Sequence, residues 1–170
     1  GQNETLTWLR LGGCGLADLT AVAIASGLDA GSGGEKVPRR KGSSDDSNES
    51  DDPPSPGSSS SSPLAVLDLS SNLFTPDGVK HLCSSLCFGT SSLHRLDLSY
   101  TFDMGDEGAY ALADVLRIAP SETFSIRELS LRNCGIGDAG FVALGQAAMH
   151  CARLEVLELG GNDLNEEVVA

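Results

Sequence analysis

The sequence predicts an α/β solenoid of about five stacked units, with a curved parallel sheet on the concave side and helices on the convex side. Two observations lead to this fold class. First, five phrases fit one frame, L-x-x-L-x-L-x-x-N/C/T, and gaps of 58, 29, 33 and 28 residues between their second leucines indicate a period near 28. Second, the apolar spacing after each frame changes from two residues to three and four. The phrases begin at Leu6, Leu64, Leu93, Ile126 and Leu154.

Each unit is expected to begin with a short strand and to continue with a helix. The last two leucines of the frame alternate at period two, as in a strand with one buried face. The next stretch has helical spacing, as in Gly78-x3-Leu82-x3-Leu86, and Gly78, Gly108 and Gly140 are expected to allow a close approach where the helix begins. Strands and helices in this order require a parallel sheet with right-handed crossovers. Neither element buries its apolar face alone, so each unit depends on its neighbours.

The chain is predicted to divide into a first unit at residues 1–28, an insert at 29–62, and units two to five at 63–170, the last one truncated. The insert accounts for the gap of 58 residues between the second leucines of the first two phrases. Of its 34 residues, 11 are Ser, 5 are Gly and 4 are Pro, a composition that cannot bury enough apolar surface to offset the entropy of ordering. We therefore expect a disordered acidic segment, either regulatory or passive. Ser43, with an arginine three residues before it, and Ser55, directly before a proline, are its candidate phosphorylation sites.

The frame resembles leucine-rich repeats, and the 28-residue unit with a G-x-x-x-L-x-x-x-L second half resembles the ribonuclease-inhibitor-like subclass. The resemblance covers the chain except for the insert and a few terminal residues. It implies that Asn72 and Asn162 bond the backbone of the turn after the strand. It also implies that Cys14 and Cys134 fill the same slot with a small buried thiol. The departures from the pattern are Thr20, Thr101 and Val168.

Charge and hydropathy restrict the class of partner. The chain has 11 Lys and Arg against 24 Asp and Glu, which gives a formal net charge of −13 and argues against nucleic acid as the partner. No run of 18 apolar residues occurs, so no membrane span is expected. The start lacks an initiator Met and a signal-peptide pattern, and neither end of the array shows a cap. We therefore expect the chain to continue into further repeats or domains of its parent protein.

The sequence contains no recognisable catalytic or metal-binding constellation, so we expect no enzyme activity, no cofactor and no metal. Cys83 and Cys87 lie one helical turn apart, but other units carry Ala, Gly, Arg or Met at these positions, which favours packing over metal binding. The three His occupy variable positions without an acidic or nucleophilic partner. Five cysteines, an odd number, favour a reducing compartment, and we expect an intracellular protein, in the cytoplasm rather than the nucleus.

Side chains between the leucines of each strand are expected to project from the concave face and to form columns across neighbouring strands. Tryptophan, tyrosine and arginine are enriched in binding hot spots, and the single Trp and one of the two Tyr fall on this face. The alternative is a generic polar surface in contact with solvent. The candidate protein-binding residues are Trp8, Arg95, Asp97, Tyr100, Glu128 and Arg132.

The favoured function is therefore a non-enzymatic protein-interaction module that binds a protein partner on its concave strand face. A second hypothesis is a GTPase regulator that resembles the Ran GTPase-activating proteins, which use the same 28-residue unit; Arg132 and Asn133 approximate the residues it would need. A third is a purely structural segment of a larger receptor or cytoskeletal scaffold. The sequence does not identify the partner.

Overall fold

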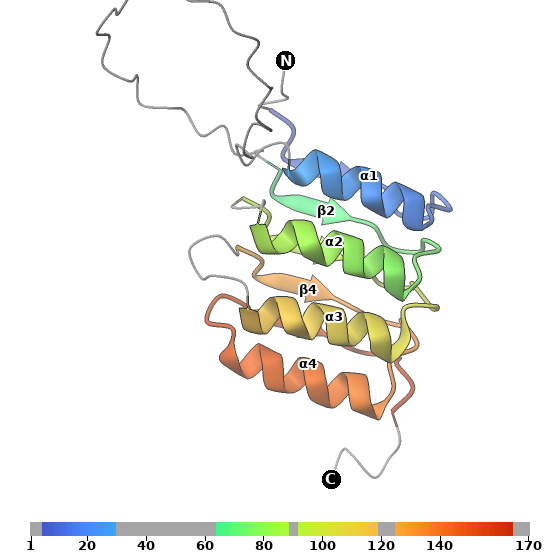
Figure 1. The fold of residues 1–170 in the computed structure, drawn as a ribbon, viewed down its shortest axis with the longest axis vertical. Helices are drawn as coiled ribbons and strands as arrows, with labels where there is room; N and C mark the ends of the chain where they lie inside the picture. Colours follow the sequence, from blue (N-terminus) through green and yellow to red (C-terminus); the bar gives the residue numbers. More distant parts are fainter. Residues whose placement is uncertain (1–4, 30–63, 89–91, 119–124, 165–170) are drawn as a thin grey trace, which may run out of the picture.

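The computed structural model describes residues 5–29, 64–88, 92–118 and 125–164, in which strands and helices alternate along the chain (Figure 1). The predicted insert and its candidate sites Ser43 and Ser55 lie outside these residues, except that Asp29 ends the first helix. The elements are β1 (Trp8–Arg10), α1 (Asp18–Asp29), β2 (Val66–Asp68), α2 (Pro76–Phe88), β3 (Arg95–Asp97), α3 (Gly105–Ile118), β4 (Glu128–Ser130), α4 (Asp138–His150) and β5 (Val156–Glu158).

The five strands of the described part form one parallel sheet in the order β1-β2-β3-β4-β5. The second leucine of every frame pairs with its counterpart in the next unit, in the series Leu9, Leu67, Leu96, Leu129 and Leu157. The helices lie side by side in chain order and form a second layer, with the strands behind them in Figure 1. This architecture confirms the predicted α/β solenoid and the alignment of the five phrases.

The core lies between the sheet and the helix layer. The frame leucines of the three central units are buried, for example Leu67 and Leu69, and so are the helix residues Leu82 and Leu86 that face them. Each of these units also buries one apolar residue between turn and helix: Phe74, Met104 and Ile136. Leucines of β1 and β5 are only half-buried, because in the described part of the chain each of these strands has a neighbour on one side.

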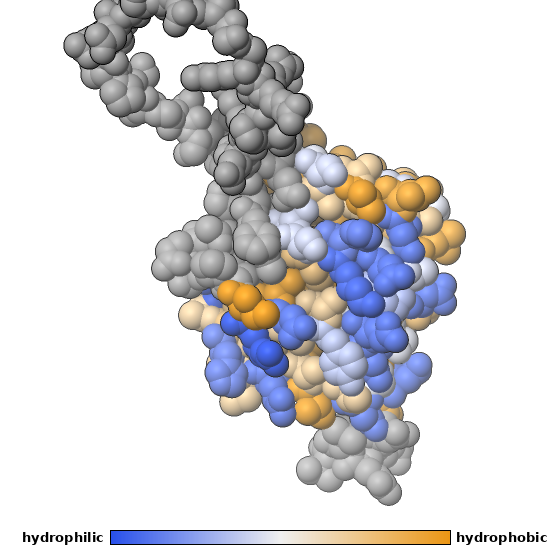
Figure 2. Space-filling model, in the orientation of Figure 1, coloured by the Kyte–Doolittle hydropathy of each residue, from blue (hydrophilic) through white to orange (hydrophobic). Residues whose placement is uncertain are grey.

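The outer surface of the helix layer differs from one helix to the next. Figure 2 shows hydrophilic side chains over much of this layer and hydrophobic patches at its α1 end. The sequence of α1 explains the difference, because its only charged residues are Asp18 and Asp29, at its two ends. Leu19 and Val22 of α1 are exposed to solvent.

Gly78 and Gly140 allow the start of one helix to approach the start of the next closely, as predicted. The Asp18 carboxylate of α1 lies against Gly78 of α2, where a Cβ atom would collide with it. In the same way Asp106 of α3 lies against Gly140 of α4 and accepts hydrogen bonds from the backbone of Gly137 (2.8 Å) and Gly140 (3.1 Å). A carboxylate at the start of one helix therefore satisfies free N–H groups at the start of the next.

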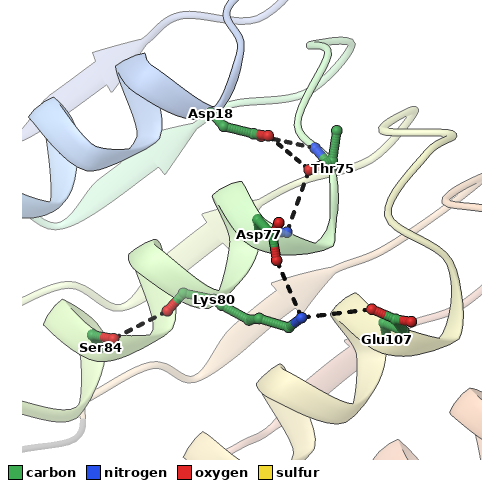
Figure 3. A network of polar contacts seen from close by, with 6 residues as sticks. All are labelled: Asp18, Thr75, Asp77, Lys80, Ser84 and Glu107. Carbon is green, nitrogen blue, oxygen red and sulfur yellow. Dashed lines mark hydrogen bonds and ion pairs between the residues drawn. The ribbon is translucent and has the colours of Figure 1, made fainter.

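A chain of polar contacts connects the starts of the first three helices (Figure 3). Asp18 accepts hydrogen bonds from the backbone N–H (2.9 Å) and the hydroxyl (2.7 Å) of Thr75, just before α2. The Thr75 oxygen in turn accepts a bond from the N–H of Asp77, whose carboxylate pairs with Lys80 at 3.2 Å. Lys80 also reaches Glu107 of α3 at 3.5 Å. The last two contacts are solvent-exposed, whereas the first two are half-buried.

The asparagine slot after the strand joins neighbouring units. The Asn72 amide donates to the carbonyls of Leu69 in its own turn (2.8 Å) and Leu11 in unit one (2.9 Å), and its oxygen accepts a bond from the N–H of Leu16 (3.0 Å). Asn162 makes the same set of contacts between units five and four. The role implied by the family resemblance is thus confirmed, and it extends to the preceding unit.

The two cysteines in this slot differ from each other. Cys134 is fully buried, its thiol donates to the carbonyl of Leu98 in unit three at 3.2 Å, and burial raises its pKa from 9.0 to about 11. Cys14 is exposed, so the expectation of a buried thiol there is wrong. The reason is that no unit of the described chain packs on the outer side of β1.

Candidate binding face

The face of the sheet opposite the helices, called the strand face here, carries the predicted columns of side chains. The observed strand register confirms two of these columns. One column is Trp8, Val66, Arg95, Glu128 and Val156; the other is Arg10, Asp68, Asp97, Ser130 and Glu158.

The β1 end of the strand face is a hollow of about 250 Å³ lined by both aromatic and charged groups. Trp8 is 53% exposed, and the guanidinium carbon of Arg10 lies 3.9 Å from the centroid of its ring, a cation–π contact. The hollow is lined by Trp8, Arg10, Val66, Asp68, Arg95 and Asp97. It offers an apolar surface and hydrogen-bonding groups in the same place, which is the composition of a protein-binding hot spot.

The β4 and β5 end of the strand face is instead a lattice of internal polar contacts. Arg95 pairs with Glu128 at 3.1 Å, and Arg132 pairs with Glu158 at 2.8 Å. The Ser130 hydroxyl donates to Glu158 at 2.8 Å. The bond from Ser130, followed by the bond from Arg132, lowers the pKa of Glu158 below its usual value. These charged groups are therefore already engaged with one another.

Asp68 and Asp97, which are neighbours in the second column, have no ion-pair partner in the described part of the chain. Each carboxylate instead accepts bonds from the serine two residues along. Asp68 binds the backbone N–H (3.0 Å) and hydroxyl (2.7 Å) of Ser70, and Asp97 binds the backbone N–H of Ser99 (3.0 Å). Of the three acids in this column, only Glu158 is neutralised by a cation.

The turn after β3 adds aromatic side chains that the sequence analysis did not select together. Tyr100 adopts a left-handed backbone conformation with φ of 62°. Its ring meets Phe102 edge-on, with centroids 6.2 Å apart. Phe102 was not among the candidates, and neither was Leu73, which occupies the same position in unit two. The aligned phrases contained the signal, because both are large apolar residues at a turn position where units one and four carry glycine.

The six candidate residues thus lie on one face or at its edge. Among them, Arg95 pairs with Glu128 through their side chains, and the backbone N–H of Tyr100 donates to the carbonyl of Arg132 at 2.7 Å. Trp8, Arg132 and Tyr100 have partners outside the predicted set: Arg10, Glu158 and Phe102 respectively. Their role in binding a partner stays a prediction.

No three His, Cys, Asp or Glu side chains in the described part of the chain are grouped in a way that could hold a metal ion. Of the helices described, none is long and apolar enough to cross a membrane. Cys14, Cys83, Cys134 and Cys151 are thiols rather than disulfides.

Comparison with known proteins agrees with the repeat geometry. Residues 60–83, 91–113 and 124–145 match the family model described as "Leucine Rich repeat". The chain contains leucine-rich repeats. Each matched stretch covers a strand, its turn and the first part of a helix, in units two, three and four. The match does not separate the ribonuclease-inhibitor-like subclass from other leucine-rich repeats, so that finer assignment stays a prediction.

The leucine-rich repeat chain is also similar to the Tonsoku-like protein of Bos taurus. The two are 38% identical over 107 residues, which is 59% of this chain and 7% of the bovine protein. The similarity therefore concerns a small part of the length of that relative.

Proposed function

We propose that this chain is a protein-interaction module of a larger leucine-rich repeat protein and binds a protein partner on the strand face. The observation that carries the proposal is the β1 end of that face, where Trp8 and Val66 stay exposed or half-exposed beside carboxylates without ion-pair partners. Leucine-rich repeats generally bind proteins, and their stacked strands present one continuous surface. A net charge of −13 favours a protein partner over nucleic acid.

The other two hypotheses receive less support. A GTPase regulator of the Ran GTPase-activating kind would need a guanidinium available to a bound nucleotide, whereas Arg132 is held by Glu158. A purely structural segment would not need an exposed tryptophan on its strand face. The proposal assigns no catalytic role to this chain.

We also propose an intracellular compartment, because the four described thiols are not joined in disulfides. The similarity to the bovine protein gives no support to the cytoplasm over the nucleus, so the preference for the cytoplasm is not kept.

Affinity capture from a cell lysate with three baits tests the proposed function. The first bait is the chain itself, and the second carries Trp8→Ala, Tyr100→Ala and Arg132→Ala. The third is a matched control in the helix layer, with Leu19→Ala, Tyr110→Ala and Arg117→Ala, which are also exposed. We expect a protein that the first and third baits retain and the second loses. Equal retention by all three baits would show that the strand face is not the binding surface.

A further inference from the structure

Three apolar side chains project from the turns that follow β2 and β3. Leu73 is 62% exposed, Tyr100 46% and Phe102 66%. Phe74, the residue directly after Leu73, is fully buried, which shows that these turns have an inward and an outward position. Leu73 and Phe102 occupy the outward position in successive units. We call Leu73, Tyr100 and Phe102 the turn ridge.

The shape around the turn ridge makes it a protrusion. Gly15 of unit one and Gly135 of unit four occupy the same outward position, so the ridge has no side chain of that position on either side of it. Gly135 cannot be replaced without strain, because its φ is 67° and a Cβ atom would meet the carbonyl oxygen of Phe102. The turn ridge is therefore flanked by glycine on both sides along the array.

Tyr100 has an unfavourable backbone conformation. Its φ of 62° is in the left-handed region, which costs free energy for a bulky residue. The aligned positions of the other units hold small residues: Gly13, Ser71, Asn133 and Gly161. Packing of the Tyr100 ring in the core does not offset this free energy, because nearly half of its surface is exposed and its ring partner, Phe102, is exposed as well.

The charges beside the turn ridge are negative and lack ion-pair partners. Asp68 and Asp97 precede the two turns, and the exposed Asp103 follows Phe102; none of the three has an ion pair within the part of the chain that the structure describes. Arg95, the cation of the strand face in units two and three, is held by Glu128. Asp103, the charged group directly next to the ridge residue Phe102, is thus an exposed acid without an ion pair among the described residues.

We propose that the turn ridge is the docking point for a peptide segment of the partner protein in which an apolar side chain is flanked by lysine or arginine. The apolar side chain would cover Leu73 and Phe102, where it removes apolar surface from water. The flanking cations would lie against Asp97 and Asp103 and over the faces of the aromatic rings. This inference rests on the proposed function, since it names the kind of partner and extends the binding surface from the strand face to its turn edge.

Selection from a phage-displayed library of random 12-residue peptides, with the intact chain as bait, tests the inference. We expect the enriched peptides to carry Leu, Ile, Met or Phe with Lys or Arg within two positions on either side. A synthetic copy of the most enriched peptide then gives dissociation constants by fluorescence anisotropy. Leu73→Ser with Phe102→Ser should weaken its binding at least tenfold, and Asp103→Asn at least threefold.

Matched variants distinguish docking at the ridge from non-specific binding of the peptide to other exposed side chains. Tyr110→Ser with Met149→Ser removes exposed apolar side chains from the helix layer, and Asp163→Asn removes an exposed acid from the turn after β5. Both should change the dissociation constant by less than twofold. Because all these side chains are exposed, circular dichroism should show a folded chain in every case.

Three results would overturn the inference: no enriched peptide, enriched peptides without the basic and apolar pattern, or undiminished binding by the Leu73→Ser and Phe102→Ser variant. The proposed function is judged separately. If a captured protein is lost by Trp8→Ala with Arg132→Ala and kept by the ridge variant, the strand face is the binding surface and the ridge is not.

Discussion

The junction between units one and two and the junction between units two and three align the same elements but are joined by different side chains. At the first junction, Asn72 connects the turns through its buried amide, and Asp18 connects the helix starts through Thr75. The backbone N–H of Leu73 adds a bond to the carbonyl of Leu16 at 2.8 Å. Side chains and backbone together connect the first two units from the sheet to the helices.

The second junction lacks these connections within the described residues. Thr101 takes the place of asparagine, and its hydroxyl donates to Leu98 in its own unit at 2.7 Å. Pro76 takes the place of Asp18, and its side chain has no group that could accept a hydrogen bond from the start of α3. What remains is the sheet, the apolar packing and the exposed pair of Lys80 and Glu107.

This difference shows that sheet pairing and apolar packing can join two units without the Asn and Asp connections, and we expect those connections to set how firmly each pair of units is joined. Asp106 and Asn162 connect the next two junctions, so the junction between units two and three stands out. The turn ridge lies at this junction. We therefore expect the relative position of neighbouring units to change most easily at this junction, where the exposed apolar side chains project.

The largest expected effect comes from removing the buried amide of the first junction. Asn72→Ala leaves the carbonyls of Leu11 and Leu69 and the N–H of Leu16 without their partner and should lower the free energy of unfolding by about 3 kcal/mol. Thr101→Ala, the matched change at the second junction, frees one carbonyl and should cost about 1 kcal/mol. Urea unfolding measures both, and equal losses would contradict the difference between the junctions.

The second effect concerns the thiol that joins units three and four. Because the pKa of Cys134 is about 11 in the fold and 9.0 ordinarily, the unfolded chain loses this proton first as the pH rises. The stability that the protonated thiol contributes is complete below pH 9 and decreases between pH 9 and 11, by about 2 kcal/mol. Unfolding free energies at pH 8 and 10.5 should show this loss in the native chain and not in Cys134→Ala. A decrease of the same size in the variant would rule out Cys134 as its source.

A smaller effect is expected at the helix starts. Asp18→Ala removes two half-buried bonds to Thr75 and should cost about 1.5 kcal/mol, whereas Asp77→Ala, which removes an exposed pair, should cost much less. Gly78→Ala should destabilise the native chain more than it destabilises a chain that already carries Asp18→Ala. The reason is that the new Cβ atom would collide with the Asp18 carboxylate of the native chain. Additive losses in this double-mutant cycle would show that the two positions are independent.

The smallest effect is expected from the exposed ion pair across the second junction. Lys80 and Glu107 are 3.5 Å apart and both are exposed to solvent, so Glu107→Ala, which leaves the pair of Lys80 with Asp77 intact, should shift the urea midpoint less than any change above. The shift should vanish in 0.5 M sodium chloride, because salt screens exposed charges. A shift as large as that of Asp18→Ala, insensitive to salt, would mean that this pair is a main connection between the units.

Much of the fold was predictable from the sequence, because each unit repeats the same local rule. A leucine at every second position predicts a strand, spacing of three and four predicts a helix, and the period predicts which strands pair; the observed register agrees at all five strands. The same alignment placed Trp8, Arg95, Asp97, Glu128 and the edge residue Tyr100 on one side of the sheet. It was wrong for Cys14, since the burial of a slot depends on a neighbouring unit and not on the residue itself.

The sequence by itself thus determined the order of strands and helices, their register, and which side chains leave the core, because periodicity fixes the side of each element on which a residue lies. Only the tertiary structure decided which polar groups meet. Arg132 with Glu158, Asp18 with Thr75 and Tyr100 with Phe102 depend on rotamers and on backbone angles in the turns, to which no repeat period applies. Those contacts separate the neutralised end of the strand face from the acidic, apolar edge at which we propose that a partner binds.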